Sequence, residues 1–284
     1  MEKILVTGST GQLGSELKVL SKNYPQYEWI FSDRKEVPLN NLDVLKGQLE
    51  NIHPSIILSC GAYTAVDRAE SEKELADVVN HHAVKIIAQY AYENNVKLIH
   101  ISTDYVFDGT SSLALTEEAR TQPINVYGAT KRAGELAAIA VDPDVIIIRT
   151  SWVYSSFGHN FVKTMKRLLQ EKDSLGVVND QIGSPTYAAD LAQVMMDILG
   201  SAKWIPGIYH YSNEGEISWY EFVLAIQEIT GEKCEVSGIP SSSYPTPAAR
   251  PSFSLLDKSK IKDVYGIKVS HYKESLKNCL TFQF

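Results

Sequence analysis

The sequence predicts an α/β fold in which a doubly wound parallel sheet is joined to a smaller C-terminal lobe. Three observations support this prediction. In the first half of the 284-residue chain, short apolar segments alternate with segments of helical spacing. The apolar segments are hydrophobic throughout rather than at alternate positions, as in strands that are covered on both faces. A glycine-rich turn follows the first strand, and strands that alternate with helices form parallel sheets with right-handed crossovers.

The elements of the first half follow one another in a regular order. Strands are expected at residues 4–6, 29–31, 56–58, 96–102 and 145–149, and helices at 12–20, 44–52, 70–94 and 129–139. After Arg149 the pattern is less regular, and segments 177–187 and 237–253 are rich in Ser, Pro and Gly, which is typical of long functional loops. The sequence therefore divides into a first domain at 1–149 and a smaller lobe at 150–284, from which some segments are expected to return to the first domain.

Composition argues against several classes of protein. With 44% hydrophobic residues the chain can bury a sizeable core, but no stretch approaches the roughly 18 apolar residues that span a bilayer. Met1 to Val6 runs straight into a strand without the apolar region of a signal peptide, so a cytoplasmic protein with no membrane partner is expected. The net charge of −7 argues against a nucleic-acid partner, because such proteins need a basic surface.

The cysteines and histidines predict neither a disulfide framework nor a metal site. Cys60, Cys234 and Cys279 are widely spaced and form no CxxC pair. The seven histidines show no HExxH spacing. No structural metal is therefore predicted.

Residues 7–14 read TGSTGQLG and link the first strand to the first helix. Gly8, Gly11 and Gly14 give the spacing GxxGxxG, a variant of the GxGxxG fingerprint of dinucleotide-binding Rossmann folds. Glycines let the backbone turn tightly beside a pyrophosphate, and the helix N-terminus offers free N–H groups and a partial positive charge. An ordinary glycine-rich turn is the alternative, but the position at the start of a βαβ unit favours a dinucleotide site.

Two neighbouring residues at the end of the second strand give opposing indications about the cofactor. Asp33 stands where an acid accepts the ribose 2′-hydroxyl of NAD. Arg34 follows it, and a guanidinium can bind the 2′-phosphate of NADP through paired N–H donors. We expect NADPH to be preferred and NADH to be tolerated, although Arg34 and Lys35 would also fit a simple solvated turn.

Tyr127 and Lys131 form a YxxxK pair at the start of a predicted helix. Residues four apart lie on the same face of a helix, so the phenol and the ammonium can share one site. Carbonyl reduction needs a hydride on carbon and a proton on oxygen, and a phenol with a pKa of about 10 is a poor acid. A nearby ammonium and the positive nicotinamide ring lower that pKa, which makes Tyr127 a candidate general acid. Lys131 could also hold the nicotinamide ribose.

The segment STDYVFDG, at residues 102–109, ends the fourth predicted strand. Ligands of open α/β sheets bind at the carboxyl ends of the strands, so the Thr103 hydroxyl is placed to hydrogen-bond a substrate carbonyl. A strand-ending polar turn is the alternative. The presence of Tyr127 and Lys131 favours a catalytic Thr103 over that alternative.

Several motifs together resemble the dTDP-4-dehydrorhamnose reductase family of extended short-chain dehydrogenases. These motifs are TGSTGQLG, SCGAYTAVDRAE, STDYVFDG, YGATK, RTSWVY, NDQIGSPTYAADLA and TPAARPSFSLL, and they run from residue 3 to about residue 260. The short-chain dehydrogenase signals are shared widely, whereas RTSWVY, DQIGSPT and TPAARP are much more specific to this family.

The resemblance implies an NADPH-dependent reductase that converts dTDP-4-dehydro-L-rhamnose into dTDP-L-rhamnose for cell-surface polysaccharide synthesis. Residues 1–149 would bind the cofactor and residues 150–284 mainly the substrate. The implied catalytic triad is Thr103, Tyr127 and Lys131. The cofactor contacts expected from the glycine turn, the Arg34 argument and the resemblance together are Gly8, Thr10, Gly11, Gln12, Leu13, Gly14, Asp33, Arg34, Leu39, Ala62, Tyr63, Thr64, Tyr127 and Lys131. The implied substrate contacts are Thr103, Asp104, Tyr105, Trp152 and Arg250, with Asn160 and Gln181 as weaker candidates.

Two of the implied substrate contacts have a physical role and an ordinary alternative. The indole of Trp152 would form a flat apolar wall against a deoxysugar, and the alternative is core packing. Arg250 is the best cation for the diphosphate, and the alternative is a structural ion pair. Val79-Asn80 matches a helix position where extended members carry an asparagine near the active site, although such an asparagine could equally cap a helix or face solvent.

The chain departs from the family pattern in several places. Ser59-Cys60-Gly61 stand where the family has Asn-Ala-Ala, but the residues remain small enough for the backbone to pass close to a cofactor. Pro38-Leu39 stand where the family has an Asp-Ile pair near the adenine, so that acid is missing, and Ser155 replaces a glycine. Some relatives dimerise around magnesium, and Glu16 could be one ligand, but no convincing set of partners is evident. A homodimer is left open.

Two other functions stay open on the sequence. A nucleotide-sugar epimerase or dehydratase of the same fold would regenerate a bound NAD in each turnover, and a dehydratase usually needs an acid pair that TDYVFDG supplies less plainly. A non-catalytic NADP-binding subunit, like the regulatory subunit of methionine adenosyltransferase, also resembles this family. The intact Tyr127, Lys131 and DQIGSPT segment favour an enzyme.

Overall fold

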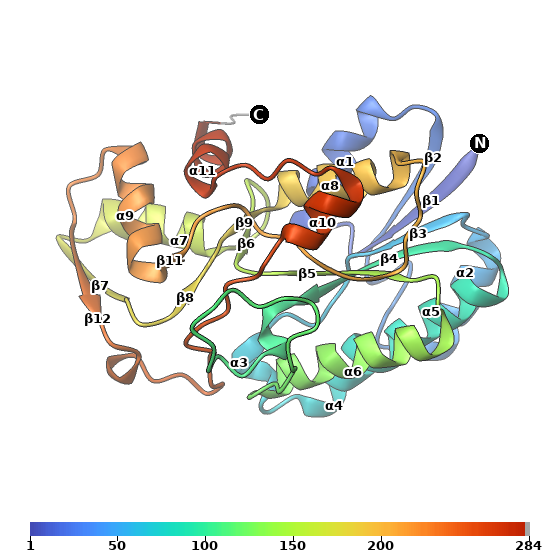
Figure 1. Ribbon diagram of the computed structural model, residues 1–284, viewed down its shortest axis with the longest axis horizontal. Helices are drawn as coiled ribbons and strands as arrows, with labels where there is room; N and C mark the ends of the chain where they lie inside the picture. The colour runs from blue at the N-terminus through green and yellow to red at the C-terminus, as the bar shows by residue number, and fades with distance from the viewer. Residues whose placement is uncertain (282–284) are drawn as a thin grey trace.

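The computed structural model describes residues 1–281 and has a six-stranded parallel sheet at its centre (Figure 1). The strand order is β10-β5-β4-β3-β1-β2, and every pairing in it is parallel. The fold class predicted from the sequence is confirmed. The strands are β1 (Glu2–Thr7), β2 (Tyr27–Ser32), β3 (Ile56–Ser59), β4 (Lys97–Thr103), β5 (Ile146–Thr150) and β10 (Gly207–His210).

The strand order reverses between β1 and β3. From β1 the chain moves to the edge strand β2, and it then returns to the other side of β1 to form β3. Ligands of open α/β sheets bind beyond the carboxyl ends of the strands at such a reversal. The loops that leave β1 and β3, residues 8–11 and 60–65, therefore frame the expected cofactor crevice.

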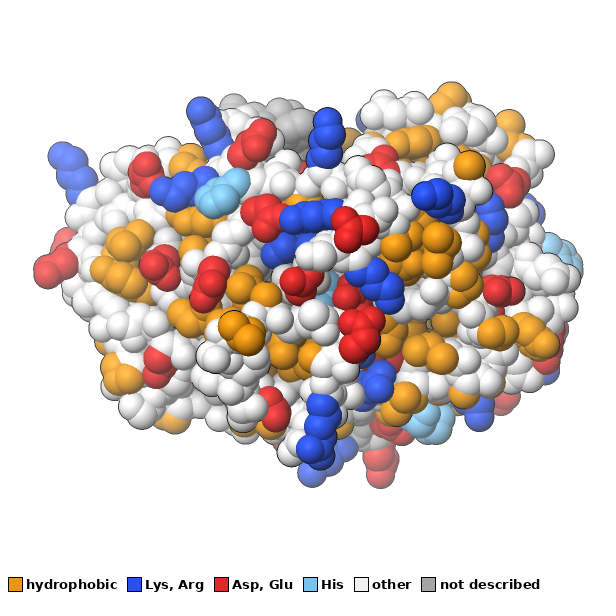
Figure 2. Space-filling model, in the orientation of Figure 1, with side chains coloured by type: hydrophobic (Ala, Val, Ile, Leu, Met, Phe, Trp, Pro, Cys, Tyr) orange, Lys and Arg blue, Asp and Glu red, His pale blue; other side chains and the backbone are white. Residues whose placement is uncertain are grey.

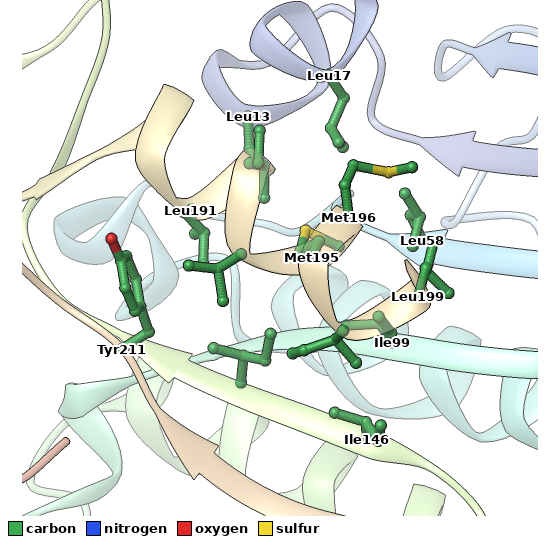
Figure 3. Packing of buried hydrophobic residues seen from close by; sticks show 14 of the residues in the cluster. Leu13, Leu17, Leu58, Ile99, Ile146, Leu191, Met195, Met196, Leu199 and Tyr211 are labelled. Atoms are coloured by element: carbon green, nitrogen blue, oxygen red, sulfur yellow. The ribbon is translucent and has the colours of Figure 1, made fainter. Parts of the chain in front are cut away.

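Helices cover both faces of the sheet, and this explains why its strands are apolar throughout. Ile4 and Val6 of β1 join the core under α1 and α8, whereas Leu5 joins the core on the opposite face. Figure 3 shows the first of these cores, in which α8 side chains such as Met195 lie between α1 and the sheet. The covering helices are α1 (Gln12–Leu20) and α8 (Ala188–Gly200) on one face, and α2 (Leu42–Ile52), α5 (Ala83–Glu93) and α6 (Val126–Val141) on the other.

The helix expected at residues 70–94 is present from Lys73 to Glu93, but it is not α-helical throughout, because its middle widens into a π turn. A short helix ends where the N–H groups of Ser71 and Glu72 both turn back to the Arg68 carbonyl. The following helix widens into a π-helical turn before it continues as α5. The short helix is α3 (Val66–Ala69), and the long helical run consists of α4 (Lys73–Asp77), the π turn η2 (Val78–His82) and α5.

The C-terminal part builds a second core and also returns to the main sheet. β10 pairs with β5. α8 packs on the sheet, as Figure 1 shows. The loops expected at 177–187 and 237–253 are only partly correct, because β7 and β12 pair in parallel there. The remaining elements are η1 (Ser21–Asn23), η3 (Asp104–Val106), β6 (Val153–Tyr154), α7 (Phe161–Glu171), β7 (Ser174–Val178), β8 (Ile182–Gly183), β9 (Thr186–Tyr187), β11 (Ile217–Ser218), α9 (Trp219–Thr230), β12 (Glu235–Ile239), η4 (Ser241–Ser243), α10 (Ser259–Tyr265) and α11 (Tyr272–Thr281).

The surface carries charges of both signs. On the face drawn in Figure 2, acidic and basic side chains are interspersed among apolar ones. Within residues 1–281, no helix combines the length and the apolar character needed to cross a bilayer.

Candidate active site

The glycine turn after β1 crosses the loop after β3 at very short range. Gly8 has a φ of +68°, which favours glycine, and a Cβ there would lie 2.6 Å from the Cα of Gly61. The Gly61 N–H also donates to the Thr7 hydroxyl at 3.2 Å. The side chain of Leu39 lies against Gly61, so it borders this crossing. A Cβ at Gly61 would meet only the end of the Leu39 side chain, at 2.7 Å, so the short range of this crossing depends on Gly8 rather than on Gly61.

The N-terminus of α1 is open toward this crevice. Gly11 occupies the cap position with extended backbone, and no side chain satisfies the first N–H groups of the helix. Gly14 packs on the turn so closely that a Cβ would lie 2.5 Å from the Gly8 carbonyl oxygen. Gln12 donates to the Val153 carbonyl at 3.2 Å, and its buried Oε1 has no partner. Free N–H groups and an orphaned polar atom fit the phosphates of a dinucleotide.

Two further predicted contacts in this turn have different surroundings. The side chain of Leu13 is buried in the core under α8, as Figure 3 shows, so only its backbone can face a ligand. Thr10 is exposed at the tip of the turn.

Asp33 uses its carboxylate to close its own turn. Its Oδ1 accepts the N–H of Lys35 at 2.7 Å and that of Glu36 at 3.2 Å, and these bonds lower the pKa of Asp33. Glu36 in return accepts the Asp33 N–H at 3.1 Å. Arg34 is exposed at the corner of this turn. The Asp33 carboxylate is thus already hydrogen-bonded to the backbone of its own turn, while Arg34 is exposed to solvent.

The loop at Ala62, Tyr63 and Thr64 is held by Asn80 of the π turn. Asn80 is fully buried, and its Oδ1 accepts the Tyr63 N–H at 2.8 Å while its Nδ2 donates to the Tyr63 carbonyl at 3.1 Å. The same Nδ2 also reaches the Thr130 hydroxyl in α6 at 3.2 Å. Asn80 therefore ties the loop after β3 to the helix that carries Tyr127 and Lys131. The sequence motif marked this position without predicting that role.

Two glycines bring α6 close to its neighbours. A Cβ at Gly128 would lie 2.1 Å from the Tyr105 carbonyl oxygen, and one at Gly134 would lie 2.1 Å from the Asn80 carbonyl oxygen. Asn125 caps the helix by accepting the Gly128 N–H at 2.7 Å. The glycine of YGATK is therefore required by the approach of η3, which follows Thr103.

Thr103 and Tyr127 meet at the carboxyl end of β4. Their side chains lie close enough to interact, and the ring of Tyr105 packs edge-on against that of Tyr127 at 5.6 Å. Burial raises the pKa of Tyr127 to about 12, a shift that the Thr103 hydroxyl opposes and the Asp104 charge reinforces. The protein groups alone therefore keep Tyr127 protonated, which differs from the lowered pKa expected from the sequence.

Lys131 is buried below Tyr127 and points into the sheet. Its Nζ donates to the Ile101 carbonyl at 2.6 Å and lies 3.3 Å from Nε2 of His100. Burial lowers the pKa of Lys131 to about 8. Burial, together with the adjacent ammonium, also lowers the pKa of His100 well below its usual value, so the imidazole is neutral. Nε2 therefore accepts from Lys131, and Nδ1–H donates to the Ser59 hydroxyl at 3.0 Å.

A buried ion-pair network supports the lysine from below. Glu135 is fully buried and accepts two bonds from Arg149, each of 2.8 Å, and one of 2.5 Å from the Ser102 hydroxyl. Arg132 adds a third cationic contact at 2.8 Å. Such a network is fully satisfied, so it fixes the position of α6 against β4 and β5.

Asp104 is the acid nearest to the Thr103–Tyr127 pair. Only 2% of it is exposed, and its Oδ1 accepts the Thr103 hydroxyl at 3.0 Å. Burial raises the pKa of Asp104 to about 6, against the hydrogen bonds from Ser254 and Thr103. The carboxylate is therefore ionised at neutral pH and becomes neutral in mild acid.

Trp152 lies in a strained conformation at the entrance to the second core. Its φ is +48°, which costs a bulky residue about 1–3 kcal/mol. Its ring stacks on that of Trp219 at 3.6 Å, and a Cβ at Gly183 would lie 3.0 Å from the indole. Both the wall and the packing interpretation of Trp152 are consistent with this stack.

Arg250 forms the ion pair that was the alternative to a phosphate contact. It reaches both carboxylate oxygens of Asp67, at 3.1 and 2.9 Å, and these bonds lower the pKa of Asp67. Asn160 caps α7 by accepting the Lys163 N–H, and Gln181 donates to the Ser241 hydroxyl. The structure thus gives each of these three candidates a protein partner.

The fold and this site define a class of protein. The site combines an open glycine turn at the reversal of the strand order with three side chains nearby. These are a threonine at the end of β4 and a tyrosine and a buried lysine near the start of α6. This is the arrangement of the extended short-chain dehydrogenases. The sequence profile described as the RmlD substrate binding domain matches residues 1–283. The chain belongs to this family.

Known relatives agree with that assignment. A dTDP-4-dehydrorhamnose reductase of Aggregatibacter actinomycetemcomitans is 40% identical over 290 residues, which cover 98% of each chain. A crystal structure of a dTDP-4-dehydrorhamnose reductase from Clostridium acetobutylicum is similar with a TM-score of 0.94 and 36% identity over 98% of both chains. One from Bacillus anthracis, in complex with NADP, has a TM-score of 0.93 and 36% identity over the same share of both chains. The family expected from the motifs is confirmed.

Proposed function

We propose that this chain is a dTDP-4-dehydrorhamnose reductase, which uses NADPH to reduce the C4 keto group of dTDP-4-dehydro-L-rhamnose to the alcohol of dTDP-L-rhamnose. The observation that carries the proposal is the adjacent Thr103 and Tyr127 side chains beside the buried Lys131. Full-length relatives of the same name support the choice of substrate. The product would serve polysaccharide synthesis, in keeping with a Bacillus subtilis relative, 38% identical, that is named a spore coat polysaccharide biosynthesis protein.

The proposed chemistry divides between the cofactor and the side chains. A bound NADPH supplies the hydride that reaches the sugar C4. Tyr127 gives its phenolic proton to the C4 oxygen, and Thr103 holds that oxygen in place by a hydrogen bond. The ammonium of Lys131 stabilises the phenolate that Tyr127 becomes, since an opposite charge nearby favours the ionised form. Because His100 is neutral, its Nε2 accepts a hydrogen bond from that ammonium and orients it without adding a second positive charge.

The cofactor would lie in the crevice at the reversal point. The uncapped N-terminus of α1 and the turn at Gly8–Gly14 would receive its phosphates. The loop 62–64 and Leu39 would flank it. Arg34 would meet the 2′-phosphate, because the Asp33 carboxylate is already bonded within its own turn. NADH would then be tolerated but bound less tightly.

The substrate would lie between the site and the C-terminal part of the chain. Trp152 would pack its strained indole against the sugar, since strain of this kind is concentrated at functional sites. Asp104 and Tyr105 would border the pyranose, and Arg250 would approach the diphosphate while paired with Asp67. The division into a cofactor domain at 1–149 and a mainly substrate-binding lobe at 150–284 belongs to this proposal, as do a cytoplasmic location and a homodimer.

The test is an NADPH-oxidation assay with dTDP-4-dehydrorhamnose beside its UDP counterpart. We expect stoichiometric loss of NADPH absorbance with the dTDP sugar and a lower kcat/KM with the UDP sugar. Conversion of the sugar without net loss of NADPH would point instead to an epimerase or dehydratase. Absence of turnover with any nucleotide sugar, together with tight binding to a synthetase, would point to a regulatory subunit.

A further inference from the structure

The π turn η2 gathers three potential metal ligands on its outer side. His81 Nδ1 lies 3.0 Å from Oδ1 of Asp77, and His82 Nε2 lies 3.1 Å from Oδ2 of the same carboxylate. All three ligand atoms lie within 4.8 Å of one another. The two imidazole rings are stacked at 4.3 Å, so both present a nitrogen to the same carboxylate.

The helix geometry explains why two consecutive histidines can share one acid. In an α-helix each residue turns by about 100°, so residues 81 and 82 would diverge from residue 77 by about 40° and 140°. The π turn places a residue over its fifth predecessor instead, as the bond from the Ala83 N–H to the Val78 carbonyl shows. His82 is therefore brought over Asp77 next to His81.

The spacing of the three atoms suits a metal ion. Zinc binds histidine nitrogen and carboxylate oxygen at about 2.0–2.2 Å with tetrahedral geometry, so neighbouring ligand atoms on one ion lie about 3.3–3.6 Å apart. The two His–Asp separations are a few tenths of an ångström shorter, so small movements of the exposed Asp77 and His82 side chains would bring the atoms to that spacing. The side chains of Asp77 and His82 are 40% and 45% exposed, which leaves room for water in the remaining positions.

We propose that Asp77, His81 and His82 form a binding site for a divalent transition-metal ion of the zinc or nickel type. Zinc and nickel bind imidazole nitrogen well, whereas calcium and magnesium favour sites made of oxygen ligands. A set of two imidazoles and one carboxylate therefore suits zinc or nickel. The site lies outside the proposed active site and is independent of the proposed reaction. Its sequence signature is a DxxxHH segment, which the HExxH pattern does not capture.

The metal would brace a segment that also holds the cofactor loop. Asn80 lies within the same π turn and binds both backbone groups of Tyr63, while its carbonyl packs against Gly134 of α6. A ligand that binds only the folded state stabilises it by mass action. Zinc should therefore raise the melting temperature of the protein by about 5 °C at roughly 100 times its Kd.

The test is calorimetric titration of chelator-treated full-length protein with zinc chloride. We expect one zinc per chain, and at least a tenfold weaker Kd in His82→Ala, His81→Ala and Asp77→Asn. The last variant keeps the shape of the side chain and its hydrogen-bonding capacity, so a loss of affinity there reports the lost carboxylate ligand. The zinc-dependent rise in melting temperature should disappear in the same variants.

His53→Asn is the matched control, because it removes an exposed histidine elsewhere. His53 lines a pocket with Asn94 and Asn95 beyond the C-terminal end of α5, whereas the proposed site precedes its N-terminal end. Its affinity for zinc should equal that of the wild type. Equal zinc affinity in wild type and His82→Ala, or no heat and no thermal shift with millimolar zinc, would overturn the proposal.

Discussion

The helix α6, which carries the proposed catalytic residues, and the turn at Asp33 are built in opposite ways. Tyr127 and Lys131 are fixed by contacts with Thr103, Ile101 and His100, and the helix itself is wedged against neighbouring backbone at Gly128. The turn at Asp33–Glu36 is largely exposed, and its hydrogen bonds close on themselves. The proposed chemistry thus depends on the packed fold, whereas the proposed choice of cofactor depends on the exposed Arg34 side chain.

The strongest test of the catalytic half of this comparison is Tyr127→Phe. Removing the phenolic hydroxyl removes the proton donor but no packing, so kcat should fall about a thousandfold with NADPH binding retained. Steady-state rates and cofactor fluorescence measure the two effects separately. Tyr92→Phe, at an exposed tyrosine on α5, should leave kcat unchanged. A residual kcat in Tyr127→Phe within tenfold of wild type would contradict the role of Tyr127.

Gly128→Ala tests whether the position of α6 depends on packing. An added methyl would meet the Tyr105 carbonyl at 2.1 Å, so the helix or η3 must shift, at a cost of about 3 kcal/mol in the free energy of unfolding. Because the shift displaces Tyr127 from Thr103, kcat should fall as well. Urea unfolding and steady-state kinetics would measure both.

Gly47→Ala is the matched control for this substitution. Gly47 lies inside α2 with nothing near its missing Cβ, so alanine there should stabilise the protein by roughly 1 kcal/mol through helix propensity. Equal stability and equal kcat in Gly128→Ala and wild type would show that α6 does not depend on that close approach.

The sequence predicted the parts of the molecule that follow from periodicity and local motifs. The strands of the first half and the helix after Gly11 are specified by nearby residues, and the structure has them where expected. The glycine spacing and the YxxxK pair similarly need only a strand–turn–helix context. The predicted site residues at the carboxyl ends of β1, β3 and β4 consequently lie on the same side of the molecule, because these neighbouring strands are parallel.

The sequence did not predict features that depend on partners far along the chain. Nothing local shows that Asn80 would bind the Tyr63 backbone, or that His100 would lie below Lys131, because each pairing spans a crossover of the fold. The π turn inside the helix at residues 73–93 was not predicted either, and Asn80 lies within that turn. The pairing of β7 with β12 joins segments that share no periodicity, and both were expected to be loops.

A smaller effect is expected at the cofactor turn. In Arg34→Ala the KM for NADPH should rise about tenfold, because a guanidinium that binds the 2′-phosphate is lost, whereas the KM for NADH should hardly change. The stability of the protein should stay within about 0.5 kcal/mol of wild type, since Arg34 is exposed. Near-equal KM values for the two cofactors, unaffected by the substitution, would contradict NADPH preference at this position.

The mildest test is the pH dependence of kcat/KM in the wild type. Burial lowers the pKa of Lys131 to about 8, so the lysine is mainly charged at pH 7 and loses its proton as pH rises. Loss of that charge withdraws support from the phenolate formed at Tyr127, and kcat/KM should fall about fourfold between pH 7 and pH 8.5. Lys131→Arg keeps a charge across this range, so its profile should lack the alkaline decrease whatever its absolute rate. A wild-type profile that stays flat to about pH 9 would show that the lysine charge in the free enzyme does not limit the reaction, and that α6 contributes position alone.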